Sequence, residues 1–220
     1  MSIQEKLAVY GRVLCNESMK KHTTYRIGGT VDYFIYPKNE LALTRILQIL
    51  KEENIPYHVL GRGSNILCSD AHFHGAIINL DRTLNDFFFE EDGVLLAQAG
   101  CSIINLSVEA MKRSMSGLEF ASGIPGSIGG ALYMNAGAYK ANIASLLKGV
   151  YVWKDGCIEW MDPKDLDYDY RHSIFQKHKD WLILGACFQL NKGDRKEIEA
   201  LMDSRRQRRM DAQPLNMPCA

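Results

Sequence analysis

The stretch Gly117–Tyr139, GLEFASGIPGSIGGALYMNAGAY, constrains the fold of this chain more than any other segment. Six of the chain's 18 glycines fall between Gly117 and Gly137. Such a density weakens a helix or a strand, but it lets the backbone take positive φ or approach a ligand closely. In Gly123–Gly130, GIPGSIGG, a run of backbone N–H groups could converge on an anion such as a pyrophosphate. A tight glycine corner between packed elements is the alternative interpretation.

Length and composition favour a folded protein of one large domain or two small ones. The chain has 220 residues, 46% of them hydrophobic and 24% charged, and its formal net charge is zero. This balance argues against disorder and against bulk electrostatic binding to nucleic acid or to a membrane. No apolar segment of a signal peptide follows MSIQEK, and no apolar run approaches the roughly 20 residues that span a bilayer. The six cysteines form no CxxC pair, so we expect a reduced cytoplasmic protein.

The first part of the chain predicts a strand–helix–strand unit after an N-terminal helix. Apolar residues at helical spacing predict that first helix over Ile3–Leu14. Asn39 is expected to cap a second helix, which ends near Glu53. Alternating or apolar residues predict strands over Val31–Tyr36, Tyr57–Leu60 and Ala76–Leu80.

The second part of the chain is richer in predicted strands. Turn residues at Glu91–Gly93 and Lys154–Gly156 predict two hairpins. The apolar run Trp181–Leu190, WLILGACFQL, predicts a buried strand. This mixed order of elements indicates an α+β fold, in which a small βαβ-like block precedes a strand-rich block.

Helices are predicted on either side of these strands. We expect Ser102 to cap a helix that Gly117 ends, and a short helix to follow Ser127. A single helical turn is expected at Pro163–Leu166. Near the end of the chain, Lys196–Met210 predicts an amphipathic helix with three apolar residues facing inward: Ile198, Leu201 and Met202.

A second glycine-rich segment, Gly61–Asn65 (GRGSN), follows a predicted strand. The third glycine of the dinucleotide fingerprint is missing because Ile66 stands there, and neither glycine segment contains the Gly-Lys-Ser/Thr of a P-loop. Two separate loops that present amides would still fit an extended ligand with a pyrophosphate in its middle. A plain β-turn is the alternative interpretation of Gly61–Asn65.

Titratable side chains gather in Tyr170–Ser173 (YRHS), between two apolar runs. Arg171 could stabilise the developing charge of a carboxylate or an enolate, because its guanidinium is a permanent cation. An ordinary ion pair with Asp167 or Asp169 is the alternative. His172 could act as a base, although a lone histidine is more often a structural residue.

Two further clusters predict less about function. His72 and His74 have the spacing of metal ligands, but no third ligand follows nearby in sequence, so we expect no metal. The segment 205–209 contains four arginines. Positive charge at the end of a helix is favoured by the helix dipole, so we expect a solvated helix end here and no nucleic-acid site.

Five segments together resemble the family of UDP-N-acetylenolpyruvoylglucosamine reductases, in the shorter form found in Gram-positive bacteria. The segments are KHTTYRIGGTVDYFIYP, LGRGSNILCSD, GLEFASGIPGSIGGALYMNAGAY, YDYRHSIF and RRQRRMDAQPLNMPCA. They occur in the order expected of the family and cover the chain from about residue 15 to Ala220. The resemblance implies an NADPH-dependent flavoenzyme that makes UDP-N-acetylmuramate, a cytoplasmic precursor of peptidoglycan.

The same resemblance implies a fold and a cofactor. The fold is the α+β, vanillyl-alcohol-oxidase/PCMH-type FAD-binding fold, with subdomains expected at residues 1–80 and 81–213 and a linker at 214–220. The cofactor is noncovalent FAD, NADPH is the reductant and a UDP-sugar is the substrate. The implied cofactor-binding residues are Gly61, Arg62, Gly63, Ser64, Asn65, Gly123, Ile124, Pro125, Gly126, Ser127, Gly129, Gly130, Asn135 and Gly137.

The resemblance also assigns roles in catalysis. Arg171 matches the family's catalytic arginine, and Tyr170, Arg208 and Arg209 match substrate-binding positions. The family's proton-donating serine would come two residues beyond Ala220, and its C-terminal glutamate would lie further on. We therefore expect the FAD-binding portion of the enzyme, without the third, substrate-binding domain and without the complete reaction. A non-catalytic nucleotide- or flavin-binding module is the alternative, and the oligomeric state is left open.

Overall fold

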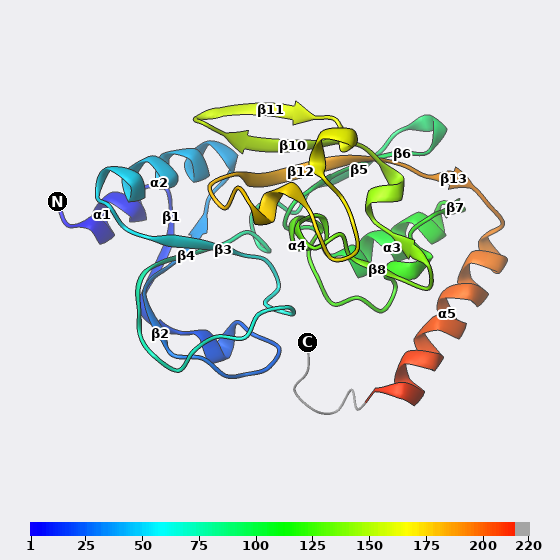
Figure 1. The fold of residues 1–220 in the computed structure, drawn as a ribbon, viewed down its shortest axis with the longest axis horizontal. Helices are drawn as coiled ribbons and strands as arrows, with labels where there is room; N and C mark the ends of the chain where they lie inside the picture. Colours follow the sequence, from blue (N-terminus) through cyan, green and yellow to red (C-terminus); the bar gives the residue numbers. More distant parts are fainter. Residues whose placement is uncertain (214–220) are drawn as a thin grey trace. The chain divides into compact units, whose positions relative to one another are not determined.

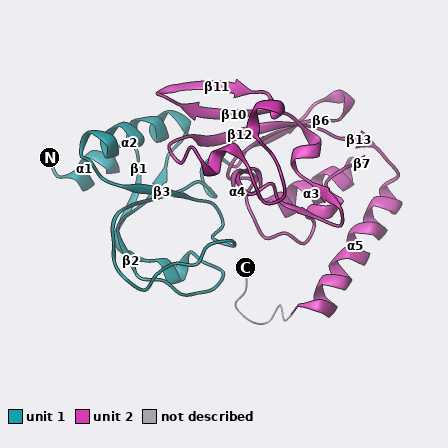
Figure 2. Cartoon of the chain, in the orientation of Figure 1, with its two compact units in different colours: residues 1–84, 218–220 teal, residues 85–217 magenta. Residues whose placement is uncertain are grey.

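The computed structural model describes residues 1–213, so the linker predicted at 214–220 lies outside the described residues. The chain divides into two compact units, Met1–Leu84 and a second that begins at Asn85 (Figure 2). The sequence placed the boundary between residues 80 and 81. That each part is an FAD-binding subdomain stays a prediction. No helix in the described range is both long enough and apolar enough to cross a membrane.

Residues 1–84 form a four-stranded sheet in the order β1-β2-β4-β3 (Figure 1). The first pair of strands is antiparallel, whereas β2, β4 and β3 run parallel to one another. Parallel strands need a crossover connection, and α2 (Glu40–Glu52) connects β2 to β3, which lie on either side of β4. The strands are β1 (Gly11–Ser18), β2 (Thr30–Pro37), β3 (Tyr57–Leu60) and β4 (Phe73–Asn79).

The prediction of one helix over Ile3–Leu14 is wrong. The helix α1 (Ile3–Ala8) ends early, and β1 follows from Gly11. A Cβ on Gly11 would lie 2.5 Å from the carbonyl oxygen of Tyr36, so only glycine allows β1 to begin this close to β2. The pairing of β1 with β2 therefore overrides the helical spacing of its apolar residues.

The second helix is confirmed as predicted. Asn39 caps α2, because its side-chain oxygen accepts a hydrogen bond from the amide of Ala42 at 2.8 Å. The helix then buries one apolar face, with residues at the i, i+3 and i+4 spacing of an amphipathic helix. That face consists of Ala42, Leu43, Ile46, Leu47, Ile49 and Leu50.

Residues 85–213 form a five-stranded antiparallel sheet in the order β11-β10-β12-β6-β5. Both predicted hairpins are confirmed, and at the second one Asp155 and Gly156 take φ of 52° and 85°. Two consecutive positive φ angles match the right-handed twist of a hairpin. The strands are β5 (Phe87–Phe89), β6 (Val94–Gln98), β10 (Leu147–Lys154), β11 (Cys157–Met161) and β12 (Leu182–Gln189).

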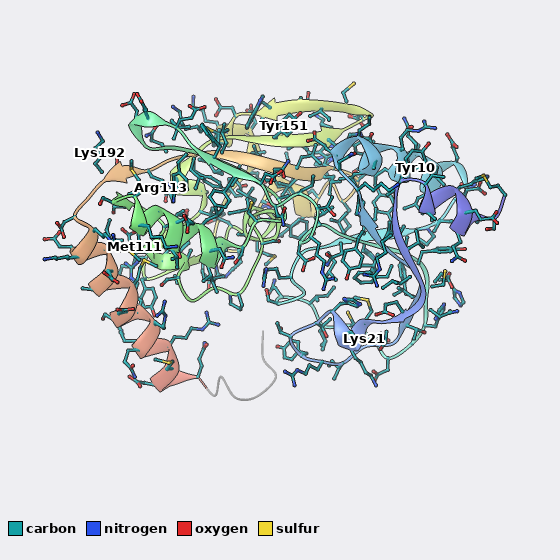
Figure 3. The ribbon with its side chains drawn as sticks, turned by 180° about the vertical axis from the view of Figure 1, so that it is seen from behind. Tyr10, Lys21, Met111, Arg113, Tyr151 and Lys192 are labelled. Atoms are coloured by element: carbon teal, nitrogen blue, oxygen red, sulfur yellow. The ribbon has the colours of Figure 1, made fainter. Side chains whose placement is uncertain are left out.

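Two helices, α3 (Ile103–Lys112) and α4 (Ile128–Tyr133), lie on one side of this sheet (Figure 1). Ser102 caps α3 as predicted, and Ser127 caps the short helix that was predicted to follow it. The prediction that Gly117 ends α3 is wrong, because the helix ends at Lys112. Arg113, at the end of α3 in Figure 3, lies 4.6 Å from the centroid of the Phe89 ring.

Short elements complete the second unit. After α3, Met115 and Ser116 pair with Lys192 and Asn191, which lead into the last helix. This pairing takes the chain out of the helical conformation before it reaches Gly117. The helical turn predicted at Pro163–Leu166 is confirmed. The short strands are β7 (Met115–Ser116), β8 (Gly137–Ala138), β9 (Ala141–Asn142) and β13 (Asn191–Lys192).

The last described helix is α5 (Arg195–Ala212). Ile198 and Met202 are buried, as predicted, but the prediction for Leu201 is wrong because that side chain is 43% exposed. The buried stripe of α5 is narrow. It contains Ile198 and Met202, which are four residues apart, but not the neighbouring Leu201. The opposite surface of the helix is strongly charged.

Candidate functional site

The loop Gly61–Asn65 leaves β3 and is held through its carbonyl groups. The carbonyl of Gly61 accepts a hydrogen bond from Asn79 Nδ2 at 2.9 Å, and that of Gly63 accepts one from the amide of Thr24 at 3.0 Å. Within residues 1–213, no amide of the loop donates a hydrogen bond. Backbone N–H groups normally find a partner, and anions bind where several are unpaired. The loop thus offers five amides to a ligand.

Gly63 has a structural reason to be glycine. Its φ is +63°, and a Cβ there would lie 1.9 Å from the carbonyl oxygen of His22. The loop therefore packs its backbone directly onto residues 22–23. The interpretation of this segment as a plain turn explains Gly63 and leaves the amides to solvent, whereas the ligand interpretation gives them an anion as their partner.

Asp81 is a buried acceptor close to this loop. Burial raises the pKa of its carboxyl group, and the positive charges of Arg82 and Arg62 oppose that rise. Its Oδ1 is buried and, among the described residues, has no hydrogen-bond partner. The amide of Asp81 donates to Asn79 Oδ1 at 3.2 Å, and Asn79 in turn holds Gly61. An unpaired buried acceptor of this kind fits a ligand that brings a donor.

The stretch Gly123–Gly130 offers fewer amides than its sequence predicts. Most of its N–H groups are already bonded within the protein, and Pro125 has none. The prediction of a converging run is therefore wrong for this stretch, since among the described residues only Gly123 and Ser127 have unpaired amides. The bonded amides are those of Ile124, Gly126, Ile128, Gly129 and Gly130.

Space, however, remains at the surface of this stretch. A Cβ on Gly130 would meet a single atom within 4 Å, Ser127 Oγ at 3.4 Å, and the residue is exposed. The fold therefore does not require glycine at this position. By contrast, a Cβ on Gly129 would lie 3.1 Å from the Cβ of Ala99, so packing explains that glycine.

Arg171 is fixed against the end of the glycine-rich stretch. Its Nη2 donates to the carbonyl of Gly137 at 3.0 Å, and its Nη1 donates to the carbonyl of Asn135 at 3.4 Å. Asn135 reaches back, because its Nδ2 donates to the carbonyl of Asp169 at 2.9 Å. The structure thus brings together Asn135, Gly137 and Arg171, three of the residues that the sequence singled out.

The backbone at this contact is strained. Arg171 has a φ of 55°, in the left-handed region that residues other than glycine rarely take, and Asn135 has a φ of 42°, which asparagine tolerates better than most residues do. Each such residue costs of order 1–3 kcal/mol, and such residues cluster at functional sites.

The ion-pair interpretation of Arg171 is wrong among the described residues. Asp167 instead binds Lys177 at 2.6 Å and His172 Nε2 at 3.2 Å. These partners hold the pKa of Asp167 below its usual value, the hydrogen bond from Lys177 being the largest cause. Asp169 accepts from the amide of Tyr170 at 2.7 Å. The guanidinium of Arg171 is therefore not neutralised by a carboxylate from this part of the chain.

Two tyrosines precede this arginine in sequence and differ in environment. Tyr170 is 84% exposed, and the guanidinium of Arg171 lies 5.3 Å from the centroid of its ring. The hydroxyl of Tyr168 is buried, which raises the pKa of the phenol, and it has no hydrogen-bond partner among the described residues. Tyr170 is therefore accessible to a ligand.

Helix α5 also brings arginines to the glycine-rich stretch. Tyr139 Oη donates to the carbonyl of Arg205 at 2.9 Å, and the guanidinium of Arg208 lies 5.7 Å from the Tyr139 ring centroid. A Cβ on Gly123 would lie 3.1 Å from Arg209 Cδ. The predicted substrate-binding residues Arg208 and Arg209 thus border the glycine-rich stretch. Sequence reasoning missed the roles of Tyr139 and Asp81, because no spacing along the chain signals a ring that contacts a distant helix or a carboxylate oxygen that folding buries.

Comparison with known proteins identifies relatives. A protein-family profile described as "FAD binding domain" matches residues 31–158. UDP-N-acetylenolpyruvoylglucosamine reductase 1 of Bacillus cereus is 42% identical over 211 residues, which are 96% of this chain and 70% of that protein.

Solved structures agree with this match. The crystal structure of UDP-N-acetylenolpyruvylglucosamine reductase from Thermus caldophilus has a TM-score of 0.77 and 28% identity, over 93% of this chain and 71% of its own. Glucooligosaccharide oxidase from Acremonium strictum has a TM-score of 0.65 at 13% identity, over 87% of this chain and 43% of its own, so that match concerns the fold alone. The predicted fold, the α+β FAD-binding fold of the vanillyl-alcohol-oxidase/PCMH type, is confirmed.

Proposed function

The chain belongs to the UDP-N-acetylenolpyruvoylglucosamine reductase family, and from this premise we propose that it binds FAD noncovalently and lets NADPH reduce it. Bound FAD supplies hydride transfer, from NADPH to the enolpyruvyl group of a UDP-sugar. The observation that carries the proposal is the loop Gly61–Asn65, whose five amides are unpaired among the described residues. The unpaired Oδ1 of Asp81 next to it also fits a ligand that donates hydrogen bonds.

Different residues of the chain would bind different parts of the cofactor. The amides of Gly61–Asn65 would hold the diphosphate, since several N–H groups pointing at one anion need no side chain. The open surface at Gly130 would let a flat ring lie against the backbone. Further cofactor-binding positions in this proposal are Gly123, Ile124, Pro125, Gly126, Ser127, Gly129, Asn135 and Gly137.

Arg171 would serve the substrate rather than the cofactor. Its guanidinium is a permanent cation held by two carbonyls, and among the described residues it has no carboxylate partner. A fixed charge of this kind would stabilise the substrate carboxylate and the enolate that forms from it. Tyr170, Arg208 and Arg209 would contribute to binding of the UDP-sugar, whose diphosphate suits arginine.

The reaction belongs to peptidoglycan precursor synthesis, and the proposal places it in the cytoplasm. The second half of the reaction needs a proton donor, and the sequence assigns that role to no serine within residues 1–220. We therefore expect a protein of these 220 residues to reduce its flavin without releasing product.

Anaerobic spectroscopy on the purified chain tests each part. Uptake of FAD with a flavin absorbance spectrum, followed by bleaching when NADPH is added, is the expected result. A protein that takes up no FAD would remove the proposal, and FAD that NADPH does not bleach would favour a non-catalytic flavin-binding module. Assaying UDP-N-acetylmuramate in the same sample tests the second half, because product formation would contradict the expected block.

A further inference from the structure

The sheet of the first unit brings three metal-ligating side chains together. Asp32 lies on β2, His72 immediately precedes β4 and His74 is the second residue of β4. One ligand atom from each lies within 4.8 Å of the other two. Sequence reasoning discounted the histidines because it found no third ligand nearby, but the parallel pairing of β2 with β4 supplies Asp32 from a distant part of the chain. We propose that Asp32, His72 and His74 bind a zinc ion.

The backbone between these strands is shaped to present the cluster. Val31 pairs with Phe73 and Tyr33 pairs with Ala76, so β4 has one extra residue opposite Asp32. Such a β-bulge redirects side chains and is over-represented next to functional sites. The bulge contains Gly75, where a Cβ would lie 2.4 Å from the carbonyl oxygen of Pro56. Glycine at this position therefore permits the bulge beside His74.

The three side chains already face one another. Asp32 Oδ1 lies 2.8 Å from His72 Nε2, and Asp32 Oδ2 lies 3.6 Å from His74 Nδ1. The centroids of the two imidazole rings are 4.5 Å apart. The carboxylate thus directs one oxygen at each histidine, so the three side chains would need only a small rearrangement to bind zinc.

A fourth residue, Thr30, contacts His72 on the side of the ring that faces away from Asp32. Thr30 Oγ1 lies 2.7 Å from His72 Nδ1, the nitrogen that faces away from Asp32. Metal-bound histidines commonly donate their second N–H to a hydrogen-bond acceptor, which fixes the tautomer and the ring orientation. Thr30 would accept that hydrogen bond and leave Nε2 free to bind the metal.

The set of ligands favours zinc among common ions. Zinc takes imidazole nitrogen and carboxylate oxygen at about 2.0–2.2 Å in tetrahedral geometry, often with three protein ligands and one water. Such bonds place neighbouring ligand atoms about 3.4 Å apart, which the present 2.8 Å and 3.6 Å contacts bracket. Calcium and magnesium require oxygen ligands and fit poorly. His74 is 85% exposed, so an ion can enter from solvent. None of these residues is among the proposed flavin-binding residues.

Isothermal titration calorimetry of the full chain with zinc chloride, after treatment with a chelator, tests the proposal. We expect one zinc per chain, and His72→Ala, His74→Ala or Asp32→Asn should each weaken binding by about ten-fold or more. Thr30→Val should weaken zinc binding by about 10–100-fold, whereas Thr30→Ser, which keeps the hydroxyl group, should bind zinc as tightly as wild type. Circular dichroism of each variant separates loss of the site from loss of the fold.

Matched controls exclude other zinc ligands. His58 lies on β3 with its ring 5.2 Å from that of Phe73, and His58→Ala should leave the affinity unchanged. Among residues 1–213 the exposed cysteines are Cys15 and Cys157, and Cys15→Ser and Cys157→Ser should also have no effect. X-ray absorption of the zinc-loaded protein should find nitrogen and oxygen neighbours only. Absence of zinc binding by the wild-type chain, sulfur in the ligand shell, or binding unaffected by His72→Ala and His74→Ala would overturn the proposal.

Discussion

Replacing Gly130 with alanine separates what the fold requires from what the cofactor requires. Gly130 lies in α4, and the added methyl would meet only Ser127 Oγ, at an ordinary contact distance of 3.4 Å. Alanine is favoured over glycine inside a helix by about 0.5–1 kcal/mol. Without FAD, the variant should therefore be more stable than wild type by about that amount.

The cofactor should respond in the opposite direction. If the flavin lies against Gly130, the methyl occupies space that the ring needs. Overpacking of this kind costs about 1–3 kcal/mol, which corresponds to about 5–150-fold weaker FAD binding. Stability and affinity should thus change with opposite signs, a result that a merely misfolded variant cannot give.

Two measurements check this prediction. Urea unfolding of the cofactor-free protein gives the stability, and quenching of flavin fluorescence gives the FAD affinity. Gly156→Ala is the control: its φ is +85° and no atom lies within 4 Å of the new Cβ, so it should lose about 1–2 kcal/mol of stability and keep its FAD affinity. Wild-type FAD affinity in Gly130→Ala would refute the reasoning that the cofactor contacts this surface.

Three further predictions concern other parts of the molecule. Gly63→Ala should destabilise the protein more than Gly156→Ala does in urea unfolding, because its Cβ would lie 1.9 Å from the His22 carbonyl oxygen; an equal loss would contradict the close approach. Arg171→Ala should leave FAD affinity unchanged and, in a form that completes the reaction, lower turnover by about 10²–10³-fold; loss of FAD would make Arg171 structural. Burial raises the pKa of Asp81, so its ionisation opposes folding once the pH exceeds its ordinary 3.8. Asp81→Asn should therefore match wild type in stability at lower pH and gain on it as the pH rises through that value, and a constant difference across pH would refute this.

Local chemistry explains why many elements were predictable from sequence. Asn39, Ser102 and Ser127 each cap the helix that the sequence assigned to them, because a cap depends on only a few neighbouring residues. Hairpins with turn glycines are equally local. The errors arise where distant segments decide, as at Gly11, whose close approach to Tyr36 turns part of a predicted helix into β1.

In the candidate site, too, local features were predictable from sequence and contacts between distant segments were not. The glycines and Arg171 were found from composition and motif, but their partners were not. Which amides stay unpaired depends on the contacts of Ser127 and its neighbours with distant backbone, such as the bond from the Ile128 amide to the Cys101 carbonyl. The pairing of Asp32 with His72 likewise depends on strand order, which spacing along the chain does not reveal.

These contacts change what the glycine-rich stretch does. Its amides are mostly consumed by the fold, so it is poorly suited to hold an anion through N–H groups. Its carbonyls at Asn135 and Gly137 instead hold the guanidinium of Arg171, whose own backbone takes a left-handed φ of 55°. Strain of this kind persists only where the surrounding structure enforces it. The stretch therefore positions a cation, and in the proposed function it is Arg171, rather than the glycine amides, that meets the substrate's negative charge.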